Sequence, residues 1–482
     1  MNAYQETFFK KYGALQFLSG FGLILLLGFW LLSVGFVHVL GLGGIILLLL
    51  IPAGMVLMMY LWAKPKTAIW GSLIMGFLIS GLGRYVAAPW GLSIDIFLFL
   101  AVLFVAINPA IVKNWKHAKN DIVLFSLVWM GYLGLEIFNP AGNGFEAWFY
   151  AMRGIGFYQV MAVPLVYLLF REEKDFQLFI KILIVFSLLG TMWGFKQQIF
   201  GVDQAEYRWL WDENHHEEHI LHGVLRVFSF YSDAGQFGAS QAMMSMLMGI
   251  LAFGPFSTWK RIGYAVLGVI FFLGFAISGT RGALAVPLFG GLAYLFCTRN
   301  FKVLIAGLGA MVTVFIILKY TFLFQGVEQV RRMRTALDPE NPSLQVRLDN
   351  QRTFGRYLAD KPFGGGVGTA GFWGARFNPN SLMANTATDS WYVKIWAETG
   401  FVGLAIHLSF LGYVIGKGGY LSMNIPNKKH RAYAMAVFSC IVGVVFSSYG
   451  NQVFGQMPTG MVMNLAIPFL FLIPEWSKKQ EK

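Results

Sequence analysis

The sequence predicts an all-α polytopic membrane protein with about 12–14 transmembrane helices and one large extracytoplasmic loop. Three observations lead to this fold class. Hydrophobic residues make up 56% of the 482 residues, and charged residues only 13%. A soluble domain usually has about a quarter of its residues charged. Apolar runs of spanning length follow one another along the chain, and a single long polar segment at about 323–388 interrupts them.

A membrane-spanning helix needs about 20 mostly apolar residues. No small-residue cleavage site follows the first apolar run, so we expect a retained helix and not a cleaved signal peptide. The runs 67–84 and 282–297 are short and contain glycine, which lowers the expected number of spans from about fourteen to about twelve. The candidate spans are 15–36, 41–62, 67–84, 90–108, 121–139, 153–170, 178–200, 236–256, 261–278, 282–297, 302–322, 389–414, 432–449 and 456–474.

Lys and Arg predict the orientation, because they gather in cytoplasmic connections. Alternate connections are rich in them, as at Lys64 and Lys66 and at Lys428 and Lys429. This pattern places both termini in the cytoplasm. The predicted organisation is transmembrane helices over 1–322, an outer loop over 323–388 and C-terminal transmembrane helices over 389–482.

The formal net charge of +13 raises the question of nucleic-acid binding. In a membrane protein such an excess is typical of cytoplasmic connections beside anionic lipid. No RNA-binding motif is present, so we expect membrane lipid as a partner and no nucleic acid. Cys297 and Cys440 fall in predicted apolar helices, and we expect buried thiols without a disulfide.

The loop 323–388 is basic although it is predicted to lie outside. Binding an anion would explain this charge, and a solvated loop with internally paired charges is the alternative. Its basic residues are Arg331, Arg332, Arg334, Arg347, Arg352, Arg356, Lys361 and Arg376.

Residues 344–358 of this loop can form a short amphipathic helix, with Arg352 and Arg356 on one face. Arg347 could then point toward a membrane-side cavity. Pro362 ends the helix, and the glycine-rich turn 363–369 follows. Backbone N–H groups in such a turn can bind phosphate, although no Gly-Lys-Ser/Thr sequence of a phosphate-binding loop follows.

Arg281 lies in residues 278–283 (Ser-Gly-Thr-Arg-Gly-Ala), at the predicted outer end of a helix. Gly279 and Gly282 would let another group approach the backbone closely. An arginine there can grip phosphate bidentately, or it can simply reach outward to the lipid headgroups. Arg226 leads into the helix that begins near Gln236, and it is either a binding residue or a solvated loop charge.

Asp233 is expected to be an N-cap of that helix. Asp389 opens the next long apolar run, and it is either an N-cap in competition with Thr388 or a general base facing the outer cavity. Lys394 and Glu398 have the i,i+4 spacing of a mutually neutralising pair.

His215, His219 and His222 share helical spacing, which raises the possibility of a metal site. The sequence His-Glu-Glu-His is one residue short of the HExxH zinc pattern. We therefore favour a solvated acidic gate that lies against the basic loop, and we expect no metal and no other cofactor.

These motifs, in this order, resemble the O-antigen ligase and Wzy-type O-antigen polymerase family of bacterial envelopes. The likeness rests on residues 278–283, on Arg347-Leu348 followed by 362–368, and on 391–403, and it covers about the second half of the chain. The resemblance implies an inverting, metal-independent glycosyltransferase of the bacterial inner membrane. Its donor would be a glycan on undecaprenyl pyrophosphate, and its acceptor another glycan or lipid A core.

The resemblance also assigns roles. Arg226 and Arg281 match arginines taken to bind the pyrophosphate, and Arg347 is a third candidate. Many ligases of the family have a histidine where this chain has Asp389, so assigning Asp389 as the base departs from the family pattern. We therefore expect a polymerase of surface polysaccharide. A ligase that transfers glycan to lipid A core is the first alternative, and a flippase of the same lipid-linked glycan is an alternative of another class.

Overall fold

The computed structural model describes residues 42–108, 115–221, 223–322, 326, 328–335 and 342–480 of a chain that divides into two units, Met1–Pro65 and Lys66–Lys482. In the first unit the described residues form helix α4 (Leu42–Ala63), which contains Pro52. This helix coincides with the candidate span 41–62. The candidate span 15–36 lies outside the described residues.

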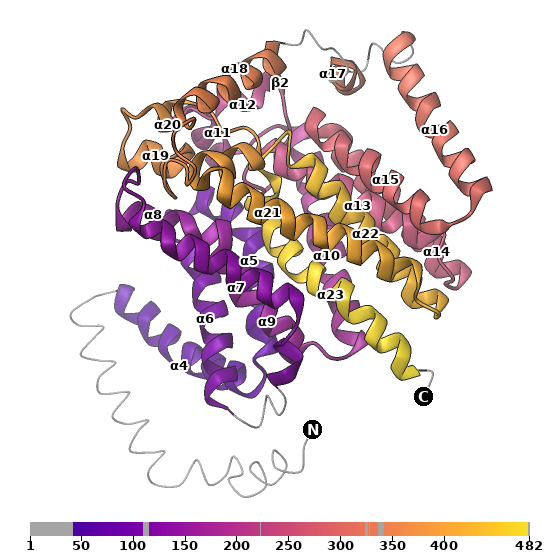
Figure 1. Cartoon of the computed structure of the whole chain (residues 1–482), viewed down its shortest axis with the longest axis horizontal. Coiled ribbons are helices and arrows are strands. Elements are labelled where there is room, and N and C mark those ends of the chain that lie inside the picture. Colours follow the sequence, from indigo (N-terminus) through magenta and orange to yellow (C-terminus); the bar gives the residue numbers. More distant parts are fainter. Residues whose placement is uncertain are drawn as a thin grey trace, which may run out of the picture. The chain divides into compact units, whose positions relative to one another are not determined.

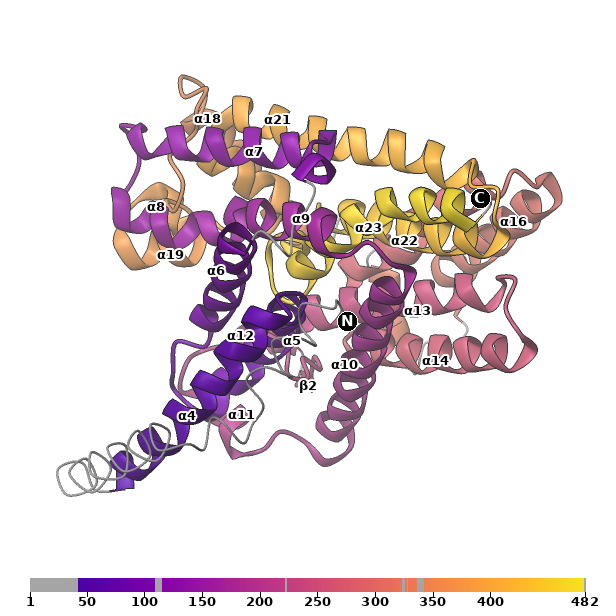
Figure 2. The ribbon, with the colours of Figure 1, turned by 90° about the horizontal axis from the view of Figure 1, so that it is seen from below.

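The second unit is built almost entirely of helices (Figures 1 and 2). Its first half contains α5 (Lys66–Tyr85), α6 (Gly91–Ile107), η1 (Trp115–Ala118), α7 (Asp121–Leu135), η2 (Glu136–Phe138), α8 (Phe145–Met152), the π-helical η3 (Arg153–Phe157), α9 (Tyr158–Leu169), α10 (Glu173–Phe200), α11 (Gln204–Trp211), α12 (His216–His219) and the strands β1 (Ile220–Leu221) and β2 (Val224–Leu225). Its second half contains α13 (Ala234–Ala252), α14 (Thr258–Ile277), η4 (Arg281–Leu284), α15 (Ala285–Thr298), α16 (Phe301–Tyr320), α17 (Glu328–Thr335), α18 (Pro342–Tyr357), α19 (Gly371–Phe377), α20 (Leu382–Asn385), α21 (Trp391–Met423), α22 (Lys428–Ser447), η5 (Val453–Gly455) and α23 (Thr459–Gln480).

Nine helical stretches among the described residues are long and apolar enough to cross a membrane, and three shorter apolar helices accompany them. The strands are confined, within the same residues, to the two-residue antiparallel pair β1–β2. These features confirm the predicted all-α polytopic membrane class. In the predicted outer loop, the described residues form the helices α17 to α20.

Helix α13 lies at the centre of the second unit and packs against α10, α14, α15 and α22. Of its 19 residues, 15 are buried. Small side chains allow this close packing: a Cβ atom on Gly238 would lie 2.4 Å from the Ser278 hydroxyl. Asp233 accepts a hydrogen bond from the Gln236 N–H at 2.9 Å, which confirms it as the N-cap.

Helix α21 packs beside α22 and α23 (Figure 1) and also beside α7 (Figure 2). It is interrupted at Gly400, which has φ 66° and ψ −170°. Backbone groups freed in a membrane helix must find other partners. The Ala397 carbonyl accepts from the Gly365 N–H at 2.8 Å, and the Thr399 carbonyl accepts from the Tyr132 hydroxyl at 2.6 Å.

The segment between α10 and α13 is anchored by Arg84, at the end of α5. The guanidinium donates to the carbonyl of Ser229 at 2.7 Å and also to the carbonyls of Tyr231 and Ser232. It lies over the Trp209 ring at 4.1 Å and the Phe228 ring at 4.5 Å. Arg84 therefore fixes the stretch of backbone that carries Arg226 and Asp233.

Ion pairs join helix ends of the second unit in another region. Lys66 pairs with Asp175 at 2.8 Å, and Glu173 pairs with Lys429 and with His430. These residues belong to the connections that the sequence places in the cytoplasm.

Candidate functional site

Arg226 lies between β2 and α13, and its side chain reaches the corner between α14 and η4. Its Nη1 donates to the Glu218 carbonyl at 2.9 Å, and its Nη2 donates to Thr280 Oγ1 at 3.2 Å. Thr280 Oγ1 donates in turn to the Ala234 carbonyl at 2.7 Å. These bonds hold Arg226 next to Arg281, although the two residues are far apart in the sequence. We call Arg226, Thr280 and Arg281 the arginine corner.

Arg281 is the first residue of η4 and is half-buried. The flanking glycines allow close approach, as predicted. A Cβ atom on Gly282 would lie 2.6 Å from Asn451 Nδ2, and one on Gly279 would lie 3.0 Å from Arg332 Nη1. A side chain at Gly282 would require Asn451 to shift, and one at Gly279 would be in tight contact with Arg332.

Charges of both signs act on the Arg226 guanidinium at the corner. Burial lowers the pKa of Arg226, and the positive charges of Arg332 and Arg281 lower it further. The carboxylates of Asp233 and Glu218 act in the opposite direction. Like charges held close together in a partly desolvated place are unfavourable, and a bound anion relieves that repulsion.

Arg347 and Asp389 both line a cavity of about 140 Å³. Arg347 Nε lies 3.6 Å from Asp389 Oδ2. Helix α18 carries Arg347 on a half-exposed face. Phe354 on its buried face, and Leu358 just after the helix, pack against α21. Pockets for drug-sized ligands are about 300–1,000 Å³. The Arg347–Asp389 cavity therefore suits one small group and not a whole oligosaccharide.

Asp389 stands just before α21, whose N-cap is Ser390. The interpretation of Asp389 or Thr388 as the helix cap is therefore wrong. Gln452 Nε2 donates to Thr388 Oγ1 at 2.9 Å and also to the Thr388 carbonyl. The Trp391 N–H donates at 2.9 Å to the carbonyl of Ser448, the C-cap of α22. The backbone is thus fixed on both sides of a carboxylate whose side chain is 42% exposed.

The arginine corner adjoins the Arg347–Asp389 cavity through the end of α22. Gly450 lines the cavity, and a Cβ atom on it would lie 3.6 Å from Gly282 Cα. Ser447 Oγ donates to the Gly282 carbonyl at 3.0 Å. The charge of Arg347 also acts on Arg281. The structure therefore brings together the four site residues expected from the sequence: Arg226, Arg281, Arg347 and Asp389.

The glycine-rich turn 363–369 has a different role from the one expected. Its N–H groups bond to protein carbonyls: Gly365 donates to Ala397, and Gly366 donates to Glu398 at 2.9 Å. Gly364, Gly366 and Gly368 have φ between 79° and 93°. The turn closes the break in α21, so the expectation that it binds phosphate is corrected.

Glu398 supports the same turn. Its side chain is fully buried, and Oε1 accepts from the Ala370 N–H at 3.3 Å. Glu398 therefore bonds to the backbone that follows the turn, and the charge of Lys394 also acts on its carboxyl group.

His215 and His219 pack on the ring of Trp209. His219 is 1% exposed, and its Nδ1 donates to the His215 carbonyl at 2.9 Å. The rings of His215 and His219 lie 4.3 Å and 5.1 Å from that of Trp209. Burial lowers the pKa of His219 to about 4, and its burial corrects the expectation of a solvated gate at this residue. His222 lies outside the described residues, among which no group of three or more His, Cys, Asp or Glu could hold a metal ion.

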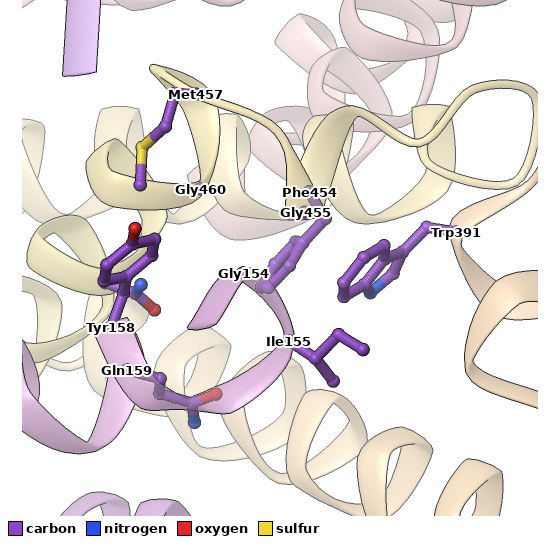
Figure 3. A pocket seen from close by; sticks show the side chains of 10 residues that line it. Gly154, Ile155, Tyr158, Gln159, Trp391, Phe454, Gly455, Met457 and Gly460 are labelled. Carbon is purple, nitrogen blue, oxygen red and sulfur yellow. The ribbon is translucent and has the colours of Figure 1, made fainter. Parts of the chain in front are cut away.

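Another cavity lies beside Trp391, between α21, α9 and the segment before α23 (Figure 3). Its polar lining includes Tyr158, Gln159 and Asn464. The cavity volume is about 10 Å³, which is room for about one water molecule. In this conformation the cavity beside Trp391 cannot hold a sugar. We therefore assign the candidate functional site to the Arg347–Asp389 cavity.

Reasoning from sequence missed several groups of the site. Arg332 appeared only among the basic residues of the loop, and its position over Gly279 depends on tertiary packing. Tyr449, Gly450 and Gln452 follow α22 and carry no motif that would distinguish them from an ordinary connection.

Comparison with known proteins finds related sequences for part of this chain. Residues 266–408 match the family model described as O-Antigen ligase, and this segment includes Arg281, Arg347 and Asp389. An O-antigen polymerase of Salmonella muenchen is 29% identical over 195 residues, which are 39% of this chain and 46% of that relative. The chain thus aligns with less than half of the relative's length. Together the two matches support the O-antigen ligase/Wzy family for this chain, which confirms the resemblance of its motifs.

Proposed function

We propose that the chain is an integral membrane glycosyltransferase. It takes a glycan from undecaprenyl pyrophosphate and transfers it to an acceptor hydroxyl at the outer face of the bacterial inner membrane, thereby polymerising a surface polysaccharide. The observation that carries the proposal is the arginine corner adjoining the Arg347–Asp389 cavity, at the ends of apolar helices.

The location suits a lipid-linked diphosphate. The corner lies at the start of α13 and α15 and at the end of α14, all apolar helices. A polyprenyl chain can remain in the membrane while its diphosphate reaches Arg226 and Arg281. Guanidinium groups match phosphate oxygens in geometry and bind them bidentately.

The proposed reaction is a single displacement. The acceptor hydroxyl attacks the anomeric carbon opposite the leaving group, so the configuration inverts. The new C–O bond forms as the bond between that carbon and the diphosphate oxygen breaks, and the lipid diphosphate leaves. Asp389 takes the hydroxyl proton, a contribution of about 10²–10⁴-fold in rate.

The arginines contribute to the leaving group. Negative charge grows on the diphosphate as the glycosidic bond breaks, and fixed guanidinium groups favour that state over the ground state. Arg347, 3.6 Å from Asp389, orients the carboxylate and brings a further positive charge to the reacting bond. Because arginines supply this charge, the scheme requires no metal.

A ligase that transfers the glycan to lipid A core is the second candidate, since the family model carries that description. We favour the polymerase because Asp389 stands where many ligases have histidine, and because the aligned relative is named a polymerase. Both reactions use the same donor chemistry and differ only in the acceptor.

The proposed orientation places both termini in the cytoplasm. The arginine corner and the Thr388–Gln452 contact join connections that the sequence places outside. The pairs Lys66–Asp175 and Lys429–Glu173 join connections predicted to be inside. Each contact therefore joins connections predicted to lie on the same side, as the proposed orientation requires.

Analysis of the reaction product tests the function. The purified protein in nanodiscs receives lipid diphosphate-linked repeat units from its host, with or without lipid A core, and the glycans are separated on a gel. A ladder without added acceptor supports the polymerase. Transfer only in the presence of lipid A core supports the ligase. If no glycosidic bond forms while the host extract is active, the enzymatic proposal fails and a flippase becomes the better explanation.

A further inference from the structure

Arg332 brings a third guanidinium to the arginine corner from the loop between α16 and α18. It lies on α17, which packs against η4. Its Nη1 is 3.0 Å from the position that a Cβ atom on Gly279 would occupy. Its Nη2 donates to the Val224 carbonyl at 3.4 Å, two residues before Arg226. The side chain therefore lies across both segments that form the corner.

Gly279 makes this position available. Its φ of 58° is one that side-chain-bearing residues rarely adopt, and any Cβ atom would press on the guanidinium of Arg332. The glycine thus serves two local requirements, the turn after α14 and the space for an arginine from another segment.

Electrostatics alone does not favour this contact. Arg332 is half-buried, and its charge acts on both Arg226 and Arg281. The charges of Arg332 and Arg281 repel that of Arg226, while the carboxylates of Asp233 and Glu218 act on Arg226 in the opposite direction. A diphosphate carries several oxygens that separate guanidinium groups can bind together.

We propose that Arg332 is a further diphosphate-binding residue, delivered by α17, and that Gly279 is the positioning residue that admits it. The loop then completes the donor site as well as covering it. This inference rests on the proposed function for the identity of the donor, but the diphosphate site can be tested without any glycan.

Arg331 provides a matched control. It is the neighbouring arginine on the same helix and is exposed, whereas Arg332 is half-buried against Gly279. Arg331→Ala and Arg332→Ala change the loop by the same charge. A difference between the two variants therefore reports position and not net charge.

The experiment measures binding of farnesyl diphosphate to the full chain in phosphatidylcholine nanodiscs, with farnesyl monophosphate as the ligand control. Arg332→Ala should weaken diphosphate binding by about 10- to 100-fold, whereas Arg331→Ala should change it by less than about twofold. Arg332→Lys should restore part of the affinity, because a lysine keeps the charge without the planar fork. Gly279→Ala should reproduce the loss seen in Arg332→Ala.

The outcomes separate this inference from the proposed function. Equal affinities of Arg332→Ala and Arg331→Ala, with unchanged thermal melting of both, would overturn the role of Arg332. The same applies if the effect of Arg332→Ala appears only with phosphatidylglycerol in the nanodisc, since the residue then binds a lipid headgroup. If the wild type binds the diphosphate through Arg332 but forms no glycosidic bond, the glycosyltransferase proposal fails and the diphosphate site stands.

Discussion

Arg347 Nε and Asp389 Oδ2 lie 3.6 Å apart, which joins a helix of the long loop to the start of α21. Their side chains are 33% and 42% exposed. An exposed pair of this kind contributes at most about 1 kcal/mol to stability. The pair therefore matters for what the carboxylate can do and much less for holding the fold together.

Replacing Asp389 with Asn should lower glycan transfer by about 10²–10⁴-fold, because the amide cannot take the proton of the acceptor hydroxyl. The variant should melt at nearly the same temperature as the wild type. Rates of product formation in nanodiscs test the first expectation, and thermal melting in detergent tests the second.

Asp349→Asn is the matched control for this change. Asp349 lies on α18, is exposed and pairs with Arg352 at 2.9 Å. Its loss should leave transfer unchanged. Equal activity of the two variants would show that Asp389 is not the base.

Arg281→Ala should abolish measurable transfer while the protein remains in the membrane, because the leaving diphosphate loses a guanidinium of the arginine corner. Arg352→Ala, which removes an exposed arginine of the loop, is the control. Transfer rates normalised to the amount of protein in the membrane provide the measurement. Full activity of Arg281→Ala would contradict the assignment of Arg281 to the diphosphate-binding site.

Gly400→Ala should destabilise the protein by about 3 kcal/mol or more. A Cβ atom there would lie 2.1 Å from the Pro362 carbonyl oxygen, and φ is 66°. Gly412→Ala in the same helix meets nothing within 4 Å and should leave the melting temperature unchanged or slightly raised. Equal melting temperatures of Gly400→Ala and Gly412→Ala would contradict this prediction. The packing of the glycine-rich turn against α21 would then not depend on the break at Gly400.

Arg84→Ala should destabilise the segment 201–233 by about 3 kcal/mol, since hydrogen bonds from a charged group contribute about 1.5–3 kcal/mol. Arg84→Lys should recover only part of this loss, because a lysine cannot reach the carbonyls of Ser229, Tyr231 and Ser232 with one planar group. Limited proteolysis of the segment, with exposed Arg208→Ala as control, measures the effect. Equal cleavage rates of Arg84→Ala and Arg208→Ala would contradict the anchoring role of Arg84.

Stability should fall in mild acid because of His219. Its pKa is lowered to about 4 in the folded protein from 6.5, since burial disfavours the charged ring. Between these values the unfolded state binds more protons, so the stabilisation is complete above about pH 6.5 and is lost as the pH falls toward 4. The shift corresponds to about 3 kcal/mol.

Thermal melting between pH 7.5 and pH 5 tests this expectation. His219→Gln should flatten the pH dependence. His216→Gln, at a half-buried position stacked on Trp211, should leave the dependence as in the wild type. If the melting temperatures of His219→Gln and His216→Gln depend on pH in the same way, the pH dependence comes from groups other than His219.

The membrane class and most of the helices could be predicted from the sequence, because apolar length and capping are local properties. The run 261–278 became α14 (Thr258–Ile277), and Asp233 caps α13 as its position indicated. The buried, unpaired thiols of Cys297 and Cys440 also followed from apolar surroundings in the sequence.

Tertiary structure alone decided which polar residues meet. Arg226 reaches Thr280, Arg347 reaches Asp389, and Arg332 reaches Gly279 through contacts between segments far apart in the chain. It also decided the role of the glycine-rich turn, whose N–H groups are taken by the carbonyls freed at the break in α21. A sequence motif shows which polar side chains and backbone groups a segment contains. The partner of each group depends on which distant helix ends are packed beside it, and that information lies in the folded chain.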